Sequence, residues 1–479
     1  MKKIATLLLA IATVATATAG GPMTNSNQSA AFLRHIARGT TLDTDAVYNN
    51  PAGTAFMTDG WHLGINDQMA KQTRTIASTF APFAMGEGNN GATKEFKGEV
   101  FSPLIPSFHL TWKKNRWAVM LGMGVNGGGG SLEFEDGLGS FERNFAVLPA
   151  GVSQLGQAFG LSANKYAMDM YLKGKSMTLA FNAGVAFRLT DWLSAAALVR
   201  YSVTSNAYEG HMKNIQINPT CAALGMNGTM MSASQFFQGV AAHPMIGANP
   251  QIAGAAAQYA AQTADHILDV KQKGNSISPV LALYAQKGAW AASVKYEFKM
   301  STELEIESAP VSAKDPVING IFADGSKIKA ETPALLAVAV SRQCGPVKVT
   351  AEWHEYFDKD AENSFSSCIT GNTMEYLLGA EWQINEKWLV STGLQRTQLD
   401  MDENKYSDMN FSISSWSWGI GGAYQITEKI RFNAGIMPTF YEDVTSKGKM
   451  SFMNNPLGEY TDVYNRTSIS WGLGLDFKF

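Results

Sequence analysis

One unit repeats along this sequence from residue 60 to the end: a segment of alternating side chains, a tight polar turn, a second alternating segment and a long loop. Successive side chains of a β-strand point to opposite faces, so this alternation predicts strands with one apolar and one polar face. The last eleven residues show it best, because small or polar residues separate the apolar residues Ile469, Trp471, Leu473, Leu475, Phe477 and Phe479.

The number of such segments decides the fold class. We predict fourteen strands, near residues 61–78, 95–112, 117–125, 171–189, 192–208, 274–286, 289–303, 333–343, 347–357, 373–384, 388–400, 412–426, 430–443 and 466–479. Short turns join six pairs, at residues 113–116, 190–191, 286–288, 344–346, 385–387 and 427–429, whereas the other connections are mostly long. Short turns on one side, long loops on the other and an even number of strands are typical of an outer-membrane barrel.

Tryptophan placement and composition favour the same fold. Most tryptophans lie at or near predicted strand ends: Trp61, Trp112, Trp117, Trp192, Trp290, Trp382 and Trp388. Aromatic residues gather in this way at bilayer interfaces, whereas the core tryptophans of a soluble sandwich have no reason to collect beside turns. Charged residues are 16% of the chain, against roughly 25% in a typical soluble protein. We therefore predict an all-β fold, a 14-stranded antiparallel transmembrane β-barrel over residues 60–479.

The first nineteen residues are typical of a secretory signal peptide. Lys2 and Lys3 precede an apolar stretch at 4–14, and small residues at 17–19 fit a cleavage site, so we expect the mature chain to begin at Gly20. A short buried helix is the alternative. Past this segment the sequence has no run of the length that a membrane helix needs. A net charge of -3 argues against a nucleic-acid partner.

The sequence offers no pattern for catalysis or for a metal site. Seven histidines are scattered without metal-ligand spacing, and no nucleophile motif is present. Three cysteines without a CxxC do not make a disulfide scaffold. Cys344 lies in a short turn, so only Cys221 and Cys368 share a side of the barrel; they could pair, or all three could be thiols. We expect neither enzyme activity nor a cofactor.

Residues 20–59 do not alternate. A short helix is predicted over 30–37, and Asn49 to Gly53 are turn residues. Arg38 with Gly39, Asp45 with Ala46, then Asn50, Pro51 and Ala52, followed by fourteen strands that end at Phe479, resemble the FadL-type family of outer-membrane transporters for long-chain fatty acids and other hydrophobic compounds. The resemblance covers essentially the whole mature chain in architecture. An ordinary turn before the first strand is the alternative for Asn50, Pro51 and Ala52.

The resemblance implies that residues 20–59 are a hatch that plugs the lumen, with Asn50, Pro51 and Ala52 as its motif. It implies that a hydrophobic ligand passes from an external groove to an internal pocket. Movement of the hatch then releases the ligand through a lateral opening beside a kinked third strand. Transport would be passive, by a monomer in contact with the lipid of a Gram-negative outer membrane.

The third strand runs into the glycine-rich segment 122–130. Glycine weakens strands and marks bulges, so Gly122, Gly124 and Gly127 are candidates for the lateral opening. The alternative is the start of a flexible loop. Their GxGxxG spacing does not indicate a nucleotide site, because no βαβ unit follows.

Two loops are candidates for the external groove. The loop at about 209–273 has no charged residue between Lys213 and Asp265, contains Phe236 and Phe237, and is helix-like over 255–267. The loop before it has a similar stretch at 148–161. Exposed apolar loops are typical of binding surfaces. The alternative is that their helices pack on each other and cap the barrel, and both can hold.

A carboxylate inside the barrel needs a basic partner, because an unpaired buried charge is costly. By alternation the lumen receives Arg188, Arg200, Lys295, Arg342, Lys348 and Arg431. We select Arg200 and Lys295 as candidate ligand partners, since they lie within strand interiors. The alternative is that these cations pair with wall carboxylates such as Glu297, Glu352, Glu375 or Glu381.

Two other functions compete with the transport of hydrophobic compounds. A haem-binding receptor could use His35, His211 or His243 as iron ligands. A general porin or an adhesin would share the barrel, although a general porin needs an open, charge-lined lumen, and this sequence has a plug-sized N-terminal segment and apolar loops.

Overall fold

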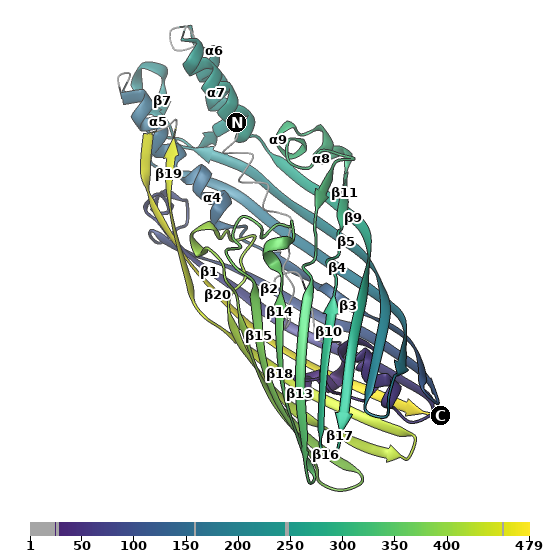
Figure 1. The fold of residues 1–479 in the computed structure, drawn as a ribbon. Helices are drawn as coiled ribbons and strands as arrows, with labels where there is room; N and C mark the ends of the chain where they lie inside the picture. The colour runs from purple at the N-terminus through teal and green to yellow at the C-terminus, as the bar shows by residue number, and fades with distance from the viewer. Residues whose placement is uncertain (1–23, 25–27, 158–159, 245–248, 453–454) are drawn as a thin grey trace.

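The computed structural model describes residues 24, 28–157, 160–244, 249–452 and 455–479; the expected signal peptide lies outside them. The described strands form one closed antiparallel barrel of fourteen strands, as predicted (Figure 1). In order around the wall they are β1 (Gly60–Phe80), β2 (Thr93–Lys114), β3 (Trp117–Phe134), β4 (Tyr166–Arg188), β5 (Leu193–Ile217), β9 (His266–Lys287), β10 (Trp290–Glu297) continued by β11 (Glu303–Ser308), β12 (Lys327–Lys329) continued by β13 (Leu335–Cys344), β14 (Val347–Tyr356), β15 (Thr373–Gln383), β16 (Trp388–Gln398), β17 (Ser415–Thr427), β18 (Ile430–Tyr441) continued by β19 (Val444–Phe452), and β20 (Asn455–Lys478).

Pairing of β1 with β20 closes the barrel, from His62 opposite Lys478 to Phe80 opposite Tyr460. The six short turns lie at one end of the barrel, which we call the turn end, and the long connections lie at the other, the loop end (Figure 1). The wall is uneven in height. β5 has 25 residues and β4 has 23, whereas β13 and β14 have 10 each.

The outer face at the turn end is a belt of large apolar side chains. On β9, Ile277, Leu281 and Leu283 are 67%, 47% and 50% exposed. The tryptophans expected at strand ends point outward as well, about half exposed, apart from the half-buried Trp112: Trp61, Trp117, Trp192, Trp290, Trp382 and Trp388. Such a belt is what strands that cross a bilayer present to lipid.

Toward the loop end the polarity of the long strands inverts. On β9 the outward residues become Lys273 and Lys271, while the inward ones change from Ser278 and Ser276 to Val270. The same inversion occurs on β2, where Glu95, Lys97 and Glu99 point outward and Phe96 and Val100 inward. The inward apolar side chains belong to one buried cluster, the loop-end cluster, which includes Phe80, Phe96, Phe134, Tyr208, Val270, Ile306 and Tyr464.

Residues 28–59 lie inside the barrel at the turn end, where their purple ribbon crosses the lumen (Figure 1). This segment contains α2 (Ala30–Arg34), α3 (Ala46–Asn49) and the 3₁₀ helix η2 (Pro51–Phe56). The helix expected over 30–37 thus ends at Arg34. We call residues 28–59 the hatch segment.

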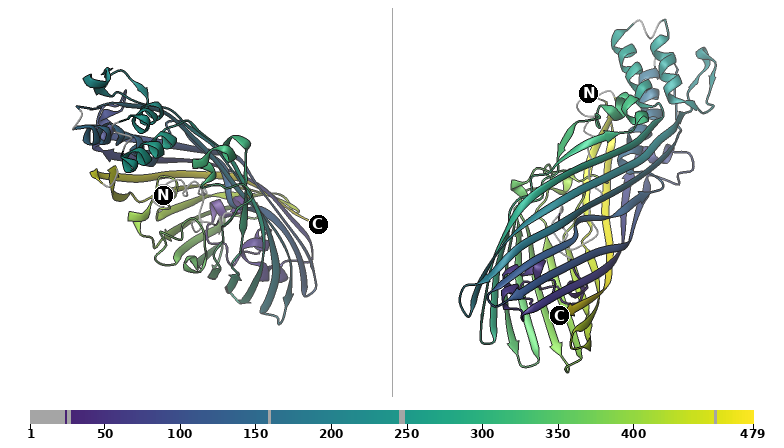
Figure 2. Two further views of the ribbon diagram at one scale, coloured as in Figure 1. Left: turned by 90° about the horizontal axis from the view of Figure 1, so that it is seen from above. Right: turned by 90° about the vertical axis from the view of Figure 1, so that its right-hand side faces the viewer.

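The long loops gather over one rim of the barrel (Figure 2). Between β3 and β4 lie α4 (Gly139–Ala146) and α5 (Leu148–Gly156). Between β5 and β9 lie α6 (Ala233–Ala242) and α7 (Pro250–Gln262), so the helix expected over 255–267 is correct in type but gives way to β9 at His266. After β11 come α8 (Pro310–Lys314) and α9 (Pro316–Asn319).

The remaining described elements are short: η3 (Ala81–Met85), β6 (Thr220–Cys221), η5 (Ala222–Leu224), β7 (Met226–Asn227), β8 (Met231–Ser232), η6 (Asp358–Asp360) and η7 (Glu403–Lys405). None of the helices in the described ranges is both long and apolar enough to cross a membrane.

Candidate functional site

Asn50, Pro51 and Ala52 form a tight turn at the start of η2. The side-chain oxygen of Asn50 accepts a hydrogen bond from the Gly53 N–H, and its Nδ2 donates to the Thr41 carbonyl at 2.9 Å. The hydroxyl of Ser194 on β5 donates to the Ala52 carbonyl at 2.6 Å. The turn therefore holds the hatch segment to itself and to the wall, which is compatible with both the hatch motif and the ordinary turn considered above.

A buried ion-pair network ties the hatch segment together and to the wall. Arg38 donates to Asp45 at 2.7 Å and to Asp43 at 2.8 Å. Asp43 reaches Arg431 of β18 at 2.9 Å, and Arg34 reaches Glu381 of β15 at 2.7 Å. Burial opposes the charge on Arg38, but Asp45 and Asp43 outweigh it and hold the pKa of Arg38 above its usual value.

Backbone groups of the hatch segment are also bound by the wall. Glu352 of β14 accepts from the Gly39 N–H at 2.7 Å, and Ser293 of β10 donates to the Gly39 carbonyl at 2.6 Å. Lys348 donates to the Thr40 carbonyl at 3.0 Å. Because charged donors and acceptors make the stronger hydrogen bonds, these contacts fix the segment in the lumen.

Arg200 and Lys295, the predicted ligand partners, both point into the lumen and both pair with Glu297. Lys295 lies 2.8 Å from Glu297, and Arg200 forms an ion pair with the same carboxylate. Both cations also stand over the ring of Tyr48 in the hatch segment, at 4.9 and 4.8 Å from its centroid. In this conformation both cations are paired with a wall carboxylate, as the alternative interpretation expected. Binding of a ligand by Arg200 and Lys295 stays a prediction.

One of the predicted lumen residues faces the other way. Arg342 is exposed and stacks on Trp290, itself 53% exposed on the outer face. It has the same parity along β13 as the outward Val338 and Val340, so the alternation was misread there. Arg188, in contrast, lies over Phe56 of the hatch segment at 4.6 Å.

The wall contains an unzipped stretch between β2 and β3. Described ladder pairs run from Lys114 to Phe108 on β2 and resume at Val100; none joins residues 101–107 to residues 124–131 of β3. We call these two stretches the seam. The outer rim of the seam is apolar, since Phe101 is 57% and Leu104 64% exposed.

The glycine-rich segment lies on the β3 edge of the seam, and the third strand continues through it to Phe134 rather than ending near residue 125. Bulges fall between Val125 and Gly127 and between Gly128 and Gly130 in the pairing with β4. Gly128 and Gly129 have φ of 69° and 107°, a conformation that favours glycine. Of the three candidates, Gly124 and Gly127 lie in the seam, whereas Gly122 is regularly paired with His109.

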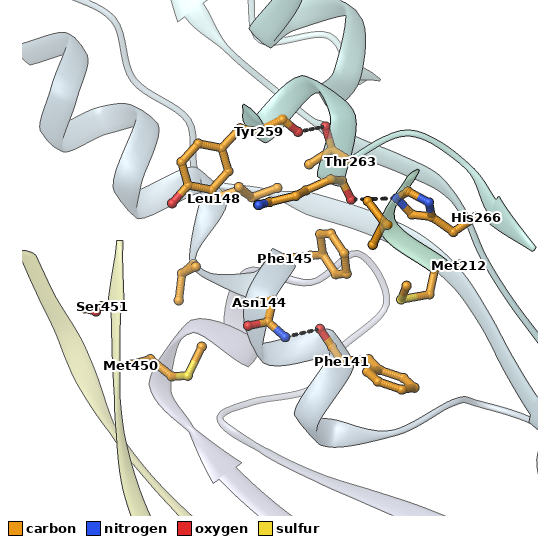
Figure 3. A pocket seen from close by; sticks show the side chains of 13 residues that line it. Phe141, Asn144, Phe145, Leu148, Met212, Tyr259, Thr263, His266, Met450 and Ser451 are labelled. Carbon is orange, nitrogen blue, oxygen red and sulfur yellow. Dashed lines mark hydrogen bonds between the residues drawn. The ribbon is translucent and has the colours of Figure 1, made fainter. Parts of the chain in front are cut away.

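A pocket of about 120 Å³ lies at the loop end between α4, α5, α7 and β19 (Figure 3). Most of its lining is apolar: Phe141, Phe145, Val147, Leu148, Met212, Val317 and Met450. Tyr259 of α7 and Met450 of β19 lie on opposite sides of it (Figure 3). The predicted groove loops thus do meet around a cavity.

Three polar side chains around this pocket are already hydrogen-bonded within the protein. His266 contacts Asp315 through Nδ1 at 2.6 Å and the Gln262 carbonyl through Nε2 at 3.2 Å. Thr263 donates to the Tyr259 carbonyl, and Asn144 to the carbonyls of α4. No lysine or arginine is among the described lining residues. The pocket therefore suits an uncharged, apolar group.

Phe236 and Phe237 lie beside this pocket rather than in it. Both are buried on α6, 5.2 Å apart, and Phe237 stacks on Tyr259 of α7 at 5.3 Å. Helices α6 and α7 therefore pack on each other, as the alternative interpretation expected. Tyr259 takes part in this packing and also lines the pocket.

Sequence reasoning missed a pair of arginines just beyond the seam toward the loop end. Arg74 of β1 and Arg466 of β20 are directly opposite each other, face inward and are 0% and 4% exposed. Arg74 stands over the ring of Phe411 at 5.3 Å, and Arg466 over Tyr441 at 4.7 Å. Alternation alone could have placed both in the lumen, but their juxtaposition depends on the closure of β1 against β20.

The three cysteines are thiols, with Cys221 and Cys368 buried and Cys344 exposed, so the described structure contains no bond between Cys221 and Cys368. The histidines considered as iron ligands are separated. His35 is buried in the hatch segment, whereas His211 lies on β5 near the loop end, 3.2 Å from Asp169. The described residues hold no cluster of three metal-ligating side chains.

No model of a known protein family matches this sequence, and no curated protein matches it. Solved structures do match over nearly its whole length. A FadL homologue from Pseudomonas aeruginosa aligns with a TM-score of 0.60 at 14% identity, over 97% of this chain and 100% of that one. The protein has the FadL fold.

Two toluene transporters share this fold with the chain. The transporter TodX from Pseudomonas putida aligns with a TM-score of 0.52 at 13% identity, over 92% of this chain and 95% of that one. The transporter TbuX from Ralstonia pickettii aligns with a TM-score of 0.50 at 15% identity, over 92% and 97%. The same fold therefore occurs in transporters of a hydrophobic compound, toluene. In this chain the barrel also contains the hatch segment and the seam.

Proposed function

We propose that this protein is a FadL-type channel for the passive diffusion of hydrophobic compounds across the outer membrane of a Gram-negative bacterium. The observation that carries the proposal is the inversion of polarity along the wall. The loop-end lumen is lined by the large loop-end cluster. The turn-end lumen is filled by the hatch segment, which is held by buried ion pairs and packs two smaller apolar clusters against the wall, and the seam lies between the two.

This arrangement favours a sideways exit. A ligand that continued toward the turn end would meet the packed hatch segment, and it would have to separate buried ion pairs such as Arg38–Asp45 and Arg34–Glu381, which is costly. Through the seam it would reach Phe101 and Leu104 and then the apolar belt. Transfer from the loop-end cluster into lipid is a move between two apolar environments and needs no coupled energy source.

Long-chain fatty acids are the ligand that we propose first. Arg74 and Arg466 support a carboxylate near the seam, because they place two guanidinium groups side by side on the inner wall, and guanidinium groups bind carboxylates through charge-assisted hydrogen bonds. The buried Nε2 of Gln72, two residues away, has no acceptor among the described atoms and offers a further donor. The uncharged loop-end pocket would take the acyl chain.

Uncharged hydrocarbons are the second candidate, favoured by the same pocket. Its volume of about 120 Å³ is close to that of a cavity of about 150 Å³ that admits benzene. A neutral ring needs no basic partner, so the two candidates differ in their dependence on the arginine pair.

The test is uptake of labelled oleate and labelled toluene by cells that lack their own transporters, with and without this protein. We expect oleate uptake that falls to background in an Arg74→Gln/Arg466→Gln variant while toluene uptake is unchanged. A double change of Asn50 and Pro51 to alanine should impair both. Toluene uptake alone would overturn the fatty acid, and uptake of neither by folded protein in the outer membrane would overturn the proposed function.

A further inference from the structure

Besides the seam, the wall has an unpaired stretch between β9 and the strand that β10 and β11 form. Ladder pairs of β9 with β10 end at Val280, and pairs with β11 resume at Lys273. None of the described ladder pairs joins residues 274–278 to residues 299–304. The chain there bonds instead to residues 328–332 on its other side, so the wall parts from β9 at this level.

This opening holds a polar pocket of about 440 Å³ on the outer face, since most of the side chains that line it are exposed. None of its described lining residues is apolar, and it includes three lysines and three carboxylates: Lys273, Lys327, Lys329, Glu303, Glu305 and Glu331. Lys273, Glu305 and Lys327 stand in one row across three neighbouring strands. The pocket therefore offers both hydrogen-bond donors and acceptors, in contrast to the mostly apolar pocket of Figure 3.

The polar pocket lies directly above the apolar belt, where β4, β5, β9 and β11 stand next to one another (Figure 1). On β9 the belt ends at Ile277, and the next outward side chains are Asn275, Lys273 and Lys271. At about 3.3 Å per residue, Lys273 is about 13 Å from Ile277 along a tilted strand. That distance takes the pocket out of the hydrocarbon and into the layer of lipid headgroups. Because the long loops of such barrels face the cell exterior, these lipids are those of the outer leaflet.

Two more lysines on the same outer face can reach a ligand beside Lys273. Lys175 of β4 and Lys271 of β9 stand on either side of the small Ala207 of β5 in one row. Strands in a sheet are about 4.8 Å apart, so about 10 Å separates the two lysine backbones, and their long side chains can meet above Ala207. Lys273 pairs with Glu307, whereas neither Lys175 nor Lys271 has an ion pair among the described residues. Three ammonium groups can thus converge on one anion.

Two ion pairs at and beside the polar pocket are exposed to solvent. The side chains of Lys273 and Glu307 are 56% and 51% exposed, and those of Lys327 and Glu303 are 59% and 62% exposed. Exposed pairs contribute little to stability, so such a lysine can turn to a phosphate, with which it makes charge-assisted hydrogen bonds. The carboxylates then accept hydrogen bonds from hydroxyl groups. They would repel a ligand that carries only negative charge, whereas a phosphorylated sugar satisfies both the lysines and the carboxylates.

We propose that Lys175, Lys271, Lys273 and the polar pocket form a binding site for the phosphorylated sugar headgroup of an outer-leaflet glycolipid of the lipid A type. The phosphate binds the three lysines, and the sugar hydroxyls bind the lining of the polar pocket. This headgroup site goes beyond the proposed function, because it lies on the outer face and its pocket shares no lining residue with the pocket of Figure 3. It anchors the long strands β4, β5 and β9 in the headgroup layer, beyond the end of their apolar belt.

The experiment measures binding by the purified protein in detergent with native mass spectrometry. The probes are bis-phosphorylated lipid A, the same lipid A after enzymatic removal of its phosphates, and inorganic phosphate. One variant removes the three lysines of the site, Lys175→Gln/Lys271→Gln/Lys273→Gln. The matched control removes three exposed lysines of β2 and β19, Lys97→Gln/Lys447→Gln/Lys449→Gln. A Ser301→Tyr variant fills the polar pocket and keeps every lysine. Heat-modifiable migration on gels verifies that each barrel is folded, and oleate uptake is measured for each variant.

We expect the native protein and the control to bind lipid A equally, and the triple variant of the site to bind it roughly tenfold more weakly or worse, because charge-assisted hydrogen bonds are lost. Ser301→Tyr should bind it more weakly as well, dephosphorylated lipid A should bind poorly to all, and oleate uptake should not change. Equal binding by the triple variant and the control, native binding by Ser301→Tyr, or undiminished binding of dephosphorylated lipid A would overturn the headgroup site. Retention of inorganic phosphate without lipid A would overturn the lipid as its ligand. Absence of oleate uptake by the native protein would count against the proposed function alone.

Discussion

The two ends of this barrel are opposites in polarity. At the turn end the wall is apolar outside, and the hatch segment fills the lumen through buried ion pairs and two small apolar clusters. At the loop end the outer face carries charges such as Lys271 and Lys273, and the inside is the loop-end cluster. The turn end is therefore built as a membrane wall with a polar plug, and the loop end as a soluble-like shell around an apolar interior.

The difference explains where an apolar ligand can go. Bilayer hydrocarbon meets the turn-end belt from outside, while the apolar interior lies on the other side of the wall and nearer the loop end. The seam between 101–107 and 124–131 lies at the height on the wall where the outer apolar belt and the inner loop-end cluster come closest together. Phe101 points outward there, and the neighbouring Val100 belongs to the loop-end cluster.

Deletion of the hatch segment should have the largest effect on the difference between the two ends of the barrel. Deletion of residues 20–59 removes the ion pairs and helices that fill the turn-end lumen, so we expect a steady ion conductance in planar bilayers, where the intact protein shows little. A porin without a plug would conduct before the deletion. Equal conductance of both proteins would show that the segment does not close the lumen.

The next effect is that of a charge placed in the apolar half. Val270 is fully buried in the loop-end cluster, next in sequence to the outward Lys271. We expect Val270→Lys to lower ligand uptake strongly and to lower thermal stability, because a buried unpaired charge is costly. The matched control, Lys271→Val, should change neither. Similar effects of the two substitutions on uptake and melting temperature would contradict the inversion of polarity.

A break in the polar half should loosen the plug without unfolding the wall. Arg38→Met leaves Asp45 without its main partner and removes one of the two close partners of Asp43, and the loss of one partner of a buried pair costs about 3–5 kcal/mol. We expect protease sites in the hatch segment to become accessible while the barrel stays resistant. Lys97→Met, which removes an exposed pair with Glu99, is the control and should give the native digestion pattern.

A smaller effect concerns pH. Burial lowers the pKa of His35 to about 4, and neither ring nitrogen has a hydrogen-bond partner among the described atoms. The neutral ring is therefore favoured in the docked hatch segment. The stability that this contributes is complete above the ordinary histidine pKa of about 6.5 and declines as pH falls from there toward 4.

We accordingly expect hatch protection against proteolysis to weaken over that pH range and His35→Phe to flatten the dependence. Gly379 lies against the imidazole and gives it room, so a ring of similar size should fit there. A His35→Phe variant with the native pH dependence would assign the effect to another group.

The strand count was accessible from the sequence, because period-two alternation and short turns act locally. A plug at residues 20–59 was expected only from the resemblance to the FadL-type family. The burial of Phe236 and Phe237 between α6 and α7 was not, since helix pairing depends on how the loops fold over the rim. The seam was foreseen only as a glycine run. Its other features become visible once β2 is placed beside β3. Pro103 and Pro106 on β2 have no N–H to donate to a ladder, and Gln28 of the hatch segment lies behind the seam, where its side chain donates to the Val125 carbonyl. Arg342 was misplaced because alternation was counted without a fixed register.

The most direct test of the sideways path is photolabelling of the purified protein in lipid nanodiscs with a diazirine analogue of oleate, followed by peptide mapping. The account predicts label in the loop-end pocket, at Phe145 or Met450, and on both edges of the seam, at Leu104 and Val125, with competition by unlabelled oleate. Competed label on turn-end hatch residues such as Val47, with none at the seam, would contradict it.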